Sequence, residues 1–378
     1  MKVLFVLNAF GPVSGAENVL LDFLKKTPEI EPFFLHIGPV KPNIKEFLKI
    51  TSIERCYYVK IDSFIMSPLS RQWFMKIFRA YLYKQIKKSI VFKEISKKSF
   101  DLVYFNNSFE AGAFYPLFEN KKTIVHIHDM VDMFRPAHKK CVLESCTESG
   151  FVLTASEACR NMLIKNGIDP SRVATVYNSI DINKENYIEH YSDKITIGFV
   201  GSAIKRKGFD IYIKILNELN RQDIFNGRKI KAIIITNSKQ EEPFFENSLS
   251  KLDIDIECNV NYGIPREMVF DQYKNMDLLL VPSRFDPLPT VILEASLKGV
   301  PVVGSNKDGI PEMQIDANML FNVDDVKDAV CKVRNWIELP FDEKKIKMNN
   351  LQTYILNNFT AIKKRKIVLD VMNKILAN

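Results

Sequence analysis

Short apolar runs alternate with amphipathic segments along most of the 378-residue chain. Several runs are apolar without alternation, as strands buried on both faces of a sheet are. Because segments of helical periodicity separate most of them, the pattern predicts α/β architecture with doubly wound parallel sheets. The predicted strands are Val3–Leu7, Phe33–Ile37, Leu102–Phe105, Thr123–His128, Phe151–Ala155 and Val173–Tyr177, then Ile195–Val200, Lys231–Thr236, Ile256–Val260, Leu278–Val281 and Val300–Val303.

A polar stretch without periodicity, residues 181–194, separates the two series of strands. We therefore predict a domain over residues 1–180, a linker over 181–194 and a second domain over 195–358. The last segment, 359–378, is a lysine-rich amphipathic helix, for which docking back on the first domain is one arrangement. Ligands of open parallel sheets bind outside the carboxyl ends of the strands, so two such sheets facing each other would share one cleft.

The composition narrows the class of protein. With 46% hydrophobic and 26% charged residues, the chain is a folded globular protein rather than a disordered one. No apolar stretch approaches the roughly 20 residues that cross a bilayer, and no cleavage site follows the N-terminal apolar run, which predicts a strand rather than a signal peptide. The six cysteines form no CxxC pair and the five histidines complete no zinc spacing. We therefore expect reduced thiols, no metal and a cytoplasmic location.

The net charge of +8 is concentrated in residues 71–98, which hold nine Lys or Arg and one acidic residue. Apolar side chains repeat there at helical spacing: Trp73, Phe74, Ile77, Phe78 and Tyr81. Basic side chains lie mostly on the other side: Arg79, Lys87, Lys93 and Lys97. The pattern predicts a basic amphipathic helix, either peripheral on the anionic inner face of the plasma membrane or packed on the core with its polar face solvated. Signatures of nucleic-acid binding are missing from the sequence, so no nucleic-acid partner is expected.

The richest candidate chemistry lies in residues 281–312. A strand ends at Val281, a loop carries Asp286, and a helix is predicted to start near Thr290. The backbone N–H groups of Thr290 and Val291 would then form an anion site at the helix start. Glu294 lies one turn further, about 6 Å along the helix axis, where its carboxylate can accept hydrogen bonds from ribose hydroxyls.

This segment resembles the signature of family-4 retaining glycosyltransferases of the GT-B fold, in which two acidic residues are separated by seven others. Asp286 and Glu294 take the two acidic positions. Asp286 replaces the usual Glu, and Pro287 and Pro289 replace the usual glycines, which removes two backbone donors. The flanking matches are Pro282, Ser283, Ala295, Gly299, Pro301, Val302 and Val303. The resemblance implies two Rossmann-like domains facing across a cleft, with Asp286 near the sugar and Glu294 on the ribose.

A second segment, residues 199–210, is similar to the family's G-R-x-x-x-x-K-G motif, whose Arg and Lys neutralise the donor diphosphate. Lys207 matches the lysine, while Ser202 stands where the family has Arg. The loss of that guanidinium removes a bidentate phosphate partner, and Arg206 is a candidate to replace its charge. The nucleobase position of the family falls on residues 260–267, where Gly263 and Ile264 are the candidates.

The first domain resembles the family more loosely. Residues 8–17 are similar to its G-G-x-E loop, which touches the donor phosphates and the acceptor: Ser14 replaces the first Gly, while Gly15 and Glu17 match. His128 resembles a strand-terminal His that lies near the reacting sugar, with a structural histidine as the alternative. Polar residues after another strand are candidates for the acceptor: Asn106, Asn107 and Ser108.

The resemblance implies a retaining, metal-independent transferase that uses a nucleotide-diphosphate sugar, with UDP- and GDP-sugars expected first, and no further cofactor. The acceptor would be a saccharide or a lipid-linked saccharide, in surface polysaccharide or glycoconjugate biosynthesis. Two alternatives stay open: an inactive or regulatory nucleotide-sugar-binding module, and an epimerase or phosphorylase of the same architecture. The Asp253-Ile-Asp255 triplet spells a metal-binding D-x-D, but it precedes a short strand and is interpreted as coincidence.

Overall fold

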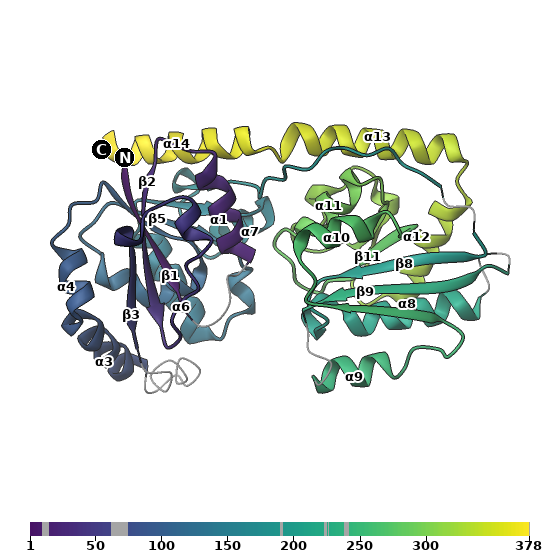
Figure 1. Ribbon diagram of the computed structural model, residues 1–378, viewed down its shortest axis with the longest axis horizontal. Helices are drawn as coiled ribbons and strands as arrows, with labels where there is room; N and C mark the ends of the chain where they lie inside the picture. Colours follow the sequence, from purple (N-terminus) through teal and green to yellow (C-terminus); the bar gives the residue numbers. More distant parts are fainter. Residues whose placement is uncertain are drawn as a thin grey trace. The chain divides into compact units, whose positions relative to one another are not determined.

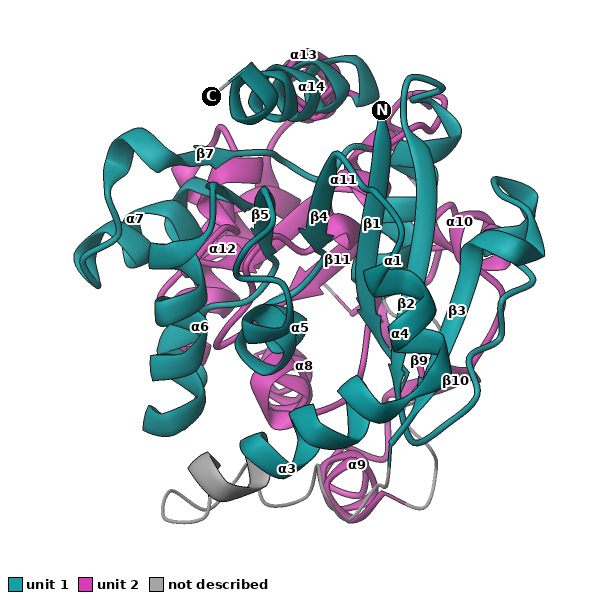
Figure 2. Cartoon of the chain, turned by 90° about the vertical axis from the view of Figure 1, so that its left-hand side faces the viewer, with its two compact units in different colours: residues 1–179, 361–378 teal, residues 180–360 magenta. Residues whose placement is uncertain are grey.

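A computed structural model describes residues 1–9, 15–61, 75–189, 192–222, 225, 227–237 and 242–377 (Figure 1). By their internal contacts the residues form two compact units, coloured separately in Figure 2. Unit 1 consists of Met1–Ser179 and Ala361–Asn378, and unit 2 of Ile180–Thr360. The C-terminal segment therefore belongs to the first unit, and residues 181–189 belong to the second.

Unit 1 is built on a seven-stranded parallel sheet of order β3-β2-β1-β4-β5-β6-β7. The strands are β1 (Lys2–Asn8), β2 (Glu31–Gly38), β3 (Cys56–Lys60), β4 (Leu102–Phe105), β5 (Thr123–Ile127), β6 (Phe151–Thr154) and β7 (Val173–Thr175). Its α-helices in the described part of the chain are α1 (Gly15–Lys25), α3 (Met75–Lys88), α4 (Ile90–Ser96), α5 (Ser108–Phe114), α6 (Pro136–Glu148), α7 (Glu157–Lys165) and α14 (Ala361–Ala377).

Unit 2 is built on a six-stranded parallel sheet of order β10-β9-β8-β11-β12-β13. The strands are β8 (Lys194–Val200), β9 (Lys229–Thr236), β10 (Glu257–Tyr262), β11 (Leu278–Val281), β12 (Val302–Ser305) and β13 (Leu320–Phe321). Among the residues of unit 2 that the structure describes, the α-helices are α8 (Phe209–Arg221), α9 (Pro243–Leu249), α10 (Arg266–Tyr273), α11 (Thr290–Leu297), α12 (Val326–Glu338) and α13 (Phe341–Asn358).

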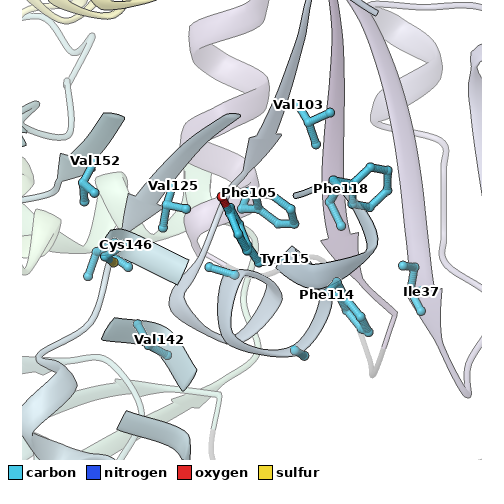
Figure 3. Close-up of a cluster of buried hydrophobic side chains, with 14 of the residues drawn as sticks. Ile37, Val103, Phe105, Phe114, Tyr115, Phe118, Val125, Val142, Cys146 and Val152 are labelled. Carbon is cyan, nitrogen blue, oxygen red and sulfur yellow. The ribbon is translucent and has the colours of Figure 1, made fainter. Parts of the chain in front are cut away.

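Apolar side chains cover both faces of the unit 1 sheet. On one face they pack against α5 and α6, where Phe105, Phe114 and Tyr115 lie in a fully buried cluster (Figure 3). On the other face, Val368 and Met372 of α14 join the buried side chains of β1 and α1. Residues 361–377 thus complete the core of unit 1 rather than extending from it.

The α/β fold class and all eleven predicted strands are confirmed, with boundaries that differ by a few residues. Two strands were not predicted: β3, and the two-residue β13. The prediction that β5 reaches His128 was wrong, because the strand ends at Ile127 and His128 lies in the following loop.

The prediction of one helix over residues 71–98 was also wrong. The segment holds two helices, α3 and α4, separated at Ser89, whose ψ of 134° is not helical. Tyr81, expected on the apolar face, is 48% exposed, while Leu82 and Ile86 of α3 and Phe92 and Ile95 of α4 are buried. The Trp73 and Phe74 predictions, and those on the side chains of Ile77, Phe78 and Arg79, lie outside the described residues. In the part of the chain that the structure describes, no helix is long and apolar enough to span a bilayer.

Both sheets reverse their strand order at one point, between β1 and β4 in unit 1 and between β8 and β11 in unit 2. The loops that follow the two adjacent strands leave in opposite directions there, which opens a crevice at the carboxyl edge of the sheet. We call these places the β1/β4 edge and the β8/β11 edge. Most of the predicted site residues lie at one or the other.

Candidate active site

The β8/β11 edge brings together two loops that are about 80 residues apart in sequence. Gly208 ends the first loop with φ +72°, in the left-handed region that favours glycine. A Cβ at Gly208 would overlap the carbonyl oxygen of Pro282 in the second loop. The close approach of the two loops therefore depends on a residue without a side chain at this position.

Lys207 and Asp286, the predicted phosphate ligand and the predicted sugar ligand, form an ion pair between these loops. Asp286 is 4% exposed. The Ser283 hydroxyl donates to its Oδ2 at 3.3 Å, and the backbone N–H of Asp286 donates to Oδ2 of Asp308 at 3.0 Å. Burial raises the pKa of Asp308. The pair places one ammonium group and one fixed carboxylate at the edge of the sheet.

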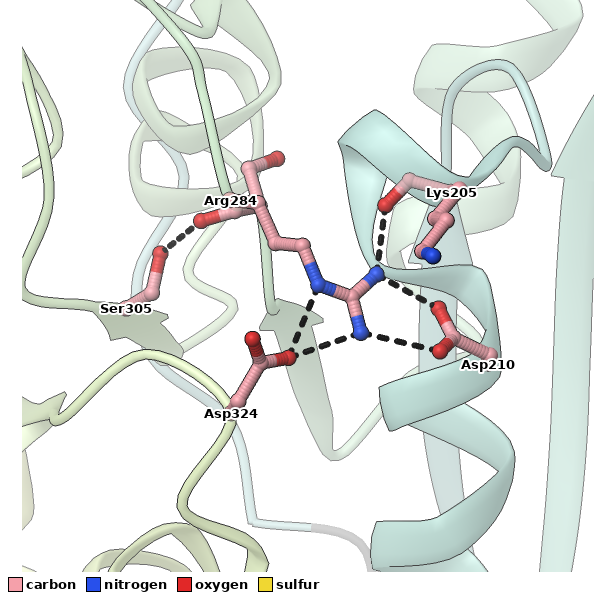
Figure 4. Close-up of polar contacts among 6 residues, drawn as sticks. Lys205, Asp210, Arg284, Ser305 and Asp324 are labelled. Atoms are coloured by element: carbon pink, nitrogen blue, oxygen red, sulfur yellow. Dashed lines mark hydrogen bonds and ion pairs between the residues drawn. The ribbon is translucent and has the colours of Figure 1, made fainter.

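Arg284, in the second loop, bonds the first loop and the start of α8 through its guanidinium (Figure 4). Its guanidinium donates to both carboxylate oxygens of Asp210 at 2.8 and 2.9 Å, to Asp324 at 2.8 Å and to the carbonyl of Lys205 at 2.6 Å. The hydrogen bond to Asp210 is the main cause that raises the pKa of Arg284. Sequence reasoning missed this residue, since only the fold shows that Asp210 lies within its reach.

Arg206 and Ser202 lie in the first loop. The Arg206 guanidinium donates to the carbonyl of Phe285 at 3.0 Å, and its own carbonyl accepts from the N–H of Arg284 at 2.9 Å. Arg206 is therefore held beside the second loop, close to Lys207. Ser202 is partly buried in the turn after β8, and its carbonyl accepts from the N–H of Ile204 at 2.9 Å.

Helix α11 begins at Thr290, as predicted, after Pro289 as N-cap. The Pro289 side chain offers no hydrogen-bond acceptor, so it cannot cap the first-turn N–H groups of Thr290 and Val291. Both residues are partly exposed. An anion at this helix start would meet the positive end of the helix dipole within the same loop that carries Asp286.

Glu294, one turn into α11, is 5% exposed and is held by two side chains from α10. Its Oε1 accepts from Arg266 at 3.1 Å and its Oε2 from the hydroxyl of the fully buried Tyr273 at 3.1 Å. Burial, together with the adjacent Glu294, raises the pKa of Tyr273. Gly263 and Ile264 lie in the turn before α10, where Gly263 has φ +57° and donates its N–H to the carbonyl of Thr236 at 2.9 Å.

The β1/β4 edge carries a buried carboxyl that sequence reasoning missed. Glu110, 1% exposed in the first turn of α5, accepts at Oε1 from the backbone N–H of Asn8 at 3.1 Å and from its side-chain amide at 2.7 Å. Its Oε2 is buried without a hydrogen-bond partner. Burial, with the nearby Glu17 adding to it, raises the pKa of Glu110 to about 7. The predicted residue Glu17 is itself buried on α1.

The predicted His128 lies next to His126, with ring centroids 3.9 Å apart. The Tyr104 hydroxyl bonds Nδ1 of His126 at 2.7 Å, while Nε2 of both histidines is buried without a partner. Burial, and then the charge of Lys364 on α14, lowers the pKa of His128 to about 3, so its imidazole is neutral at physiological pH. Burial lowers the pKa of Lys364 to about 7.

The other predicted residues of unit 1 are placed less favourably for a ligand. Asn107 caps α5, its side-chain oxygen accepting from the N–H of Ser108 at 2.7 Å. Asn106 and Ser108 are buried. Gly15 begins α1 and has open space beside its Cα. Ser14 lies outside the described residues.

Among the residues that the structure describes, no group of three or more His, Cys, Asp or Glu could hold a metal ion.

Two doubly wound α/β units, the second with an acidic pair that brackets a helix start, are the architecture of the GT-B glycosyltransferases. Residues 181–353 match the family of group 1 glycosyl transferases, and residues 45–184 match glycosyltransferase family 4. Together the two matches span residues 45–353, and the chain belongs to the glycosyltransferases of the family-4 and group 1 type.

Curated relatives and solved structures agree with this assignment. The chain is 25% identical over 257 residues to an uncharacterized 41.2 kDa protein of the cps region of Klebsiella pneumoniae, a match of 65% of this chain and 64%, just under two thirds, of that protein. It is 25% identical to an uncharacterized glycosyltransferase of Methanocaldococcus jannaschii, over 70% of this chain and 74% of that one. The fold is shared with Anabaena HepE in complex with UDP and glucose (TM-score 0.73, 18% identity, 99% and 100% coverage) and with the lipopolysaccharide outer core galactosyltransferase WaaB (0.72, 17%, 99% and 99%).

Proposed function

We propose that this protein is a retaining glycosyltransferase that moves a sugar from a nucleotide-diphosphate sugar, first among them a UDP- or GDP-sugar, to a saccharide or lipid-linked saccharide. The observation that carries the proposal is the β8/β11 edge, where Lys207, Asp286, the start of α11 and Glu294 lie together on unit 2. The UDP held by Anabaena HepE supports the donor class.

Transfer breaks the bond between the anomeric carbon and the phosphate oxygen, and the electron pair stays on the leaving diphosphate. Lys207, Arg206 and the amides of Thr290 and Val291 are cationic or donor groups, and they would stabilise that charge without a metal. By family resemblance, the acceptor hydroxyl attacks from the same face as the leaving group and gives its proton to the departing phosphate oxygen. Asp286 would orient the sugar, and neutral His128 would contribute hydrogen bonding rather than positive charge.

Thermal denaturation with a panel of UDP-, GDP-, ADP- and TDP-sugars tests the donor site. A ligand at 100 times its Kd should add about 2.7 kcal/mol of stability. We expect a selective shift that Glu294→Ala abolishes and that Glu338→Ala, on the exposed end of α12, leaves intact. Turnover of the stabilising sugar, with the anomeric configuration of the product read by NMR, then tests transfer with retention. Binding without turnover would favour the regulatory module, and a free sugar or sugar phosphate as the product would favour the alternative enzymes.

The acceptor side has weaker support, from α3 and α4 of unit 1. Ile90 is 83% exposed between exposed lysines: Lys84, Lys87, Lys88, Lys93 and Lys97. An exposed apolar side chain on a lysine-rich pair of helices fits the headgroup region of an anionic membrane. WaaB, which shares the fold, is by name a lipopolysaccharide outer core galactosyltransferase. We therefore propose peripheral contact with the inner face of the plasma membrane. Sedimentation with phosphatidylglycerol vesicles, but not with phosphatidylcholine vesicles, is expected; sedimentation with neither would remove this proposal.

A further inference from the structure

Arg266 lies in residues 260–267, the stretch that the resemblance matches to the nucleobase position, but it is neither a candidate residue there nor part of the proposed chemistry. It is the first residue of α10, and its Nη2 donates to Oε1 of Glu294 at 3.1 Å. Its Cζ lies 5.4 Å from the ring centroid of Phe270, one turn further along α10. The side chain is 48% exposed, whereas that of Glu294 is 7% exposed. The guanidinium is thus fixed on two sides and still open to solvent.

The polar side chains and amides along α11 and α10 lie in the same order as the diphosphate, the ribose and the base of a nucleotide. A diphosphate at the start of α11 meets Thr290, and the ribose that follows reaches Glu294, about 6 Å further along the helix. Arg266, on the neighbouring helix α10, bonds the Glu294 carboxylate and therefore lies next to the ribose position. The base of a nucleotide is attached to its ribose, so a base bound in this order lies against the Arg266 guanidinium and the turn at Gly263.

We propose that Arg266 reads the nucleobase of the donor, a role that rests on the proposed function. A guanidinium carries only hydrogen-bond donors, in a planar fork. Uracil and guanine present a carbonyl oxygen where adenine presents an amino group, which is itself a donor. Arg266 therefore favours nucleoside diphosphates whose base carries a ring carbonyl, and it discriminates against ADP.

A purely structural role for Arg266 makes a different prediction. If it served only to neutralise Glu294, its removal would disturb the ribose contact, which every nucleotide shares. All affinities would then fall by the same factor. Base reading instead predicts that the ratio of affinities changes. Arg266→Lys separates the two roles, because lysine keeps a positive charge near Glu294 but loses the planar fork.

Isothermal titration of the full chain with UDP, GDP and ADP measures these ratios. We expect the wild type to bind UDP or GDP more tightly than ADP. Arg266→Met should weaken the preferred nucleotide roughly 10- to 100-fold and ADP by less than about threefold, and Arg266→Lys should lose most of the preference. Arg221→Met, which removes a 71% exposed arginine at the end of α8, is the matched control and should change nothing.

The outcomes separate this inference from the proposed function. An equal loss of UDP, GDP and ADP affinity in Arg266→Met would overturn base reading and leave the donor site standing. Preference for ADP in the wild type would overturn it as well. If none of the three nucleotides bound the wild type, the donor site and the inference would fall together. A circular dichroism spectrum and an unfolding transition like those of the wild type would show that each variant is folded.

Discussion

The β8/β11 edge of unit 2 and the β1/β4 edge of unit 1 occupy equivalent places in two similar sheets, but their ionisable side chains have different partners. In unit 2 the acids and bases are paired: Lys207 with Asp286, and Arg266 with Glu294. In unit 1 the buried groups shift toward neutrality instead, since burial raises the pKa of Glu110 to about 7 and lowers that of His128 to about 3.

The difference follows from the partners available. A buried carboxylate beside a guanidinium or ammonium group keeps its charge, whereas a buried carboxyl whose partners are amides and whose neighbour is another carboxylate does not. The charged groups at the β8/β11 edge suit an anionic diphosphate. The buried groups at the β1/β4 edge offer no comparable set of paired charges, which agrees with the proposal that the donor diphosphate binds on unit 2.

The largest effect is expected from Gly208→Ala, which disrupts the contact between the two loops of unit 2. The left-handed backbone of Gly208 and the overlap of a new Cβ with the Pro282 carbonyl should together destabilise the unit by about 4 kcal/mol or more. Urea unfolding measures the loss. Gly167→Ala is the matched control, because Gly167 has φ +92° but nothing within 4 Å of an added Cβ, so only backbone strain of roughly 1–2 kcal/mol should appear. Equal losses in the two variants would contradict the close approach.

Lys364→Met tests whether burial in unit 1 disfavours the charged form of the Lys364 ammonium group. The pKa of Lys364 is about 7 in the fold against 10.5 in its ordinary state. Between these values the unfolded chain binds more protons, so wild-type stability should rise with pH across that window. Methionine should raise the free energy of unfolding by up to roughly 4 kcal/mol at pH 7, and the gain should nearly vanish at pH 10.5. Lys366→Met, at an exposed position of the same helix, should show no such pH dependence.

Glu110→Gln tests the carboxyl on the same edge. Its pKa is about 7 in the fold against 4.5 ordinarily, so the native state binds more protons between these values, and wild-type stability should fall as the pH rises through them. Glutamine keeps the acceptor for Asn8 and should stabilise the protein by roughly 3 kcal/mol at pH 8, with little effect at pH 4.5. Urea unfolding over a pH series measures this, with Glu119→Gln as an exposed control. A gain of equal size at both pH values would contradict the account.

The smallest of these effects, but the closest to function, is expected from Lys207→Met. Loss of the ammonium group and the uncompensated charge left on Asp286 should weaken binding of a nucleoside diphosphate roughly 10- to 100-fold, more at low salt than at high salt. Isothermal titration measures the change, and Lys214→Met on the exposed face of α8 is the control. Unchanged affinity in Lys207→Met would mean that the phosphates bind elsewhere.

The fold could be predicted because parallel strands buried on both faces consist of consecutive apolar residues. The edge strand β3 was missed although Cys56–Val59 form a short apolar run, and its burial alternates along the strand instead of being continuous. The strand β13 was missed because it has only two residues. The break between α3 and α4 was missed because the amphipathic pattern continues through it, although Ser89 is a residue type that favours helix starts. Spacing alone does not show whether one helix or two carry a pattern.

The candidate residues of unit 2 could be predicted because they lie on short motifs next to strands. Their partners could not, since Arg284 meets Asp210, and Arg266 meets Glu294, only after strands distant in sequence are paired. Glu110 carried a weak signal, as Asn107 and Glu110 have the spacing of a helix capping box. The fold aims its carboxyl at Asn8 instead, which the sequence does not reveal.

Hydrogen exchange with and without UDP or GDP tests the central claim, that the nucleotide diphosphate binds the β8/β11 edge of unit 2. The account predicts slower exchange of the amides in residues 201–209, 263–266 and 290–294 on nucleotide binding, with no change in residues 106–110 of unit 1, which are candidates for the acceptor. Slower exchange confined to unit 1 would contradict the account, because the charged groups of unit 2 would then not be the diphosphate site.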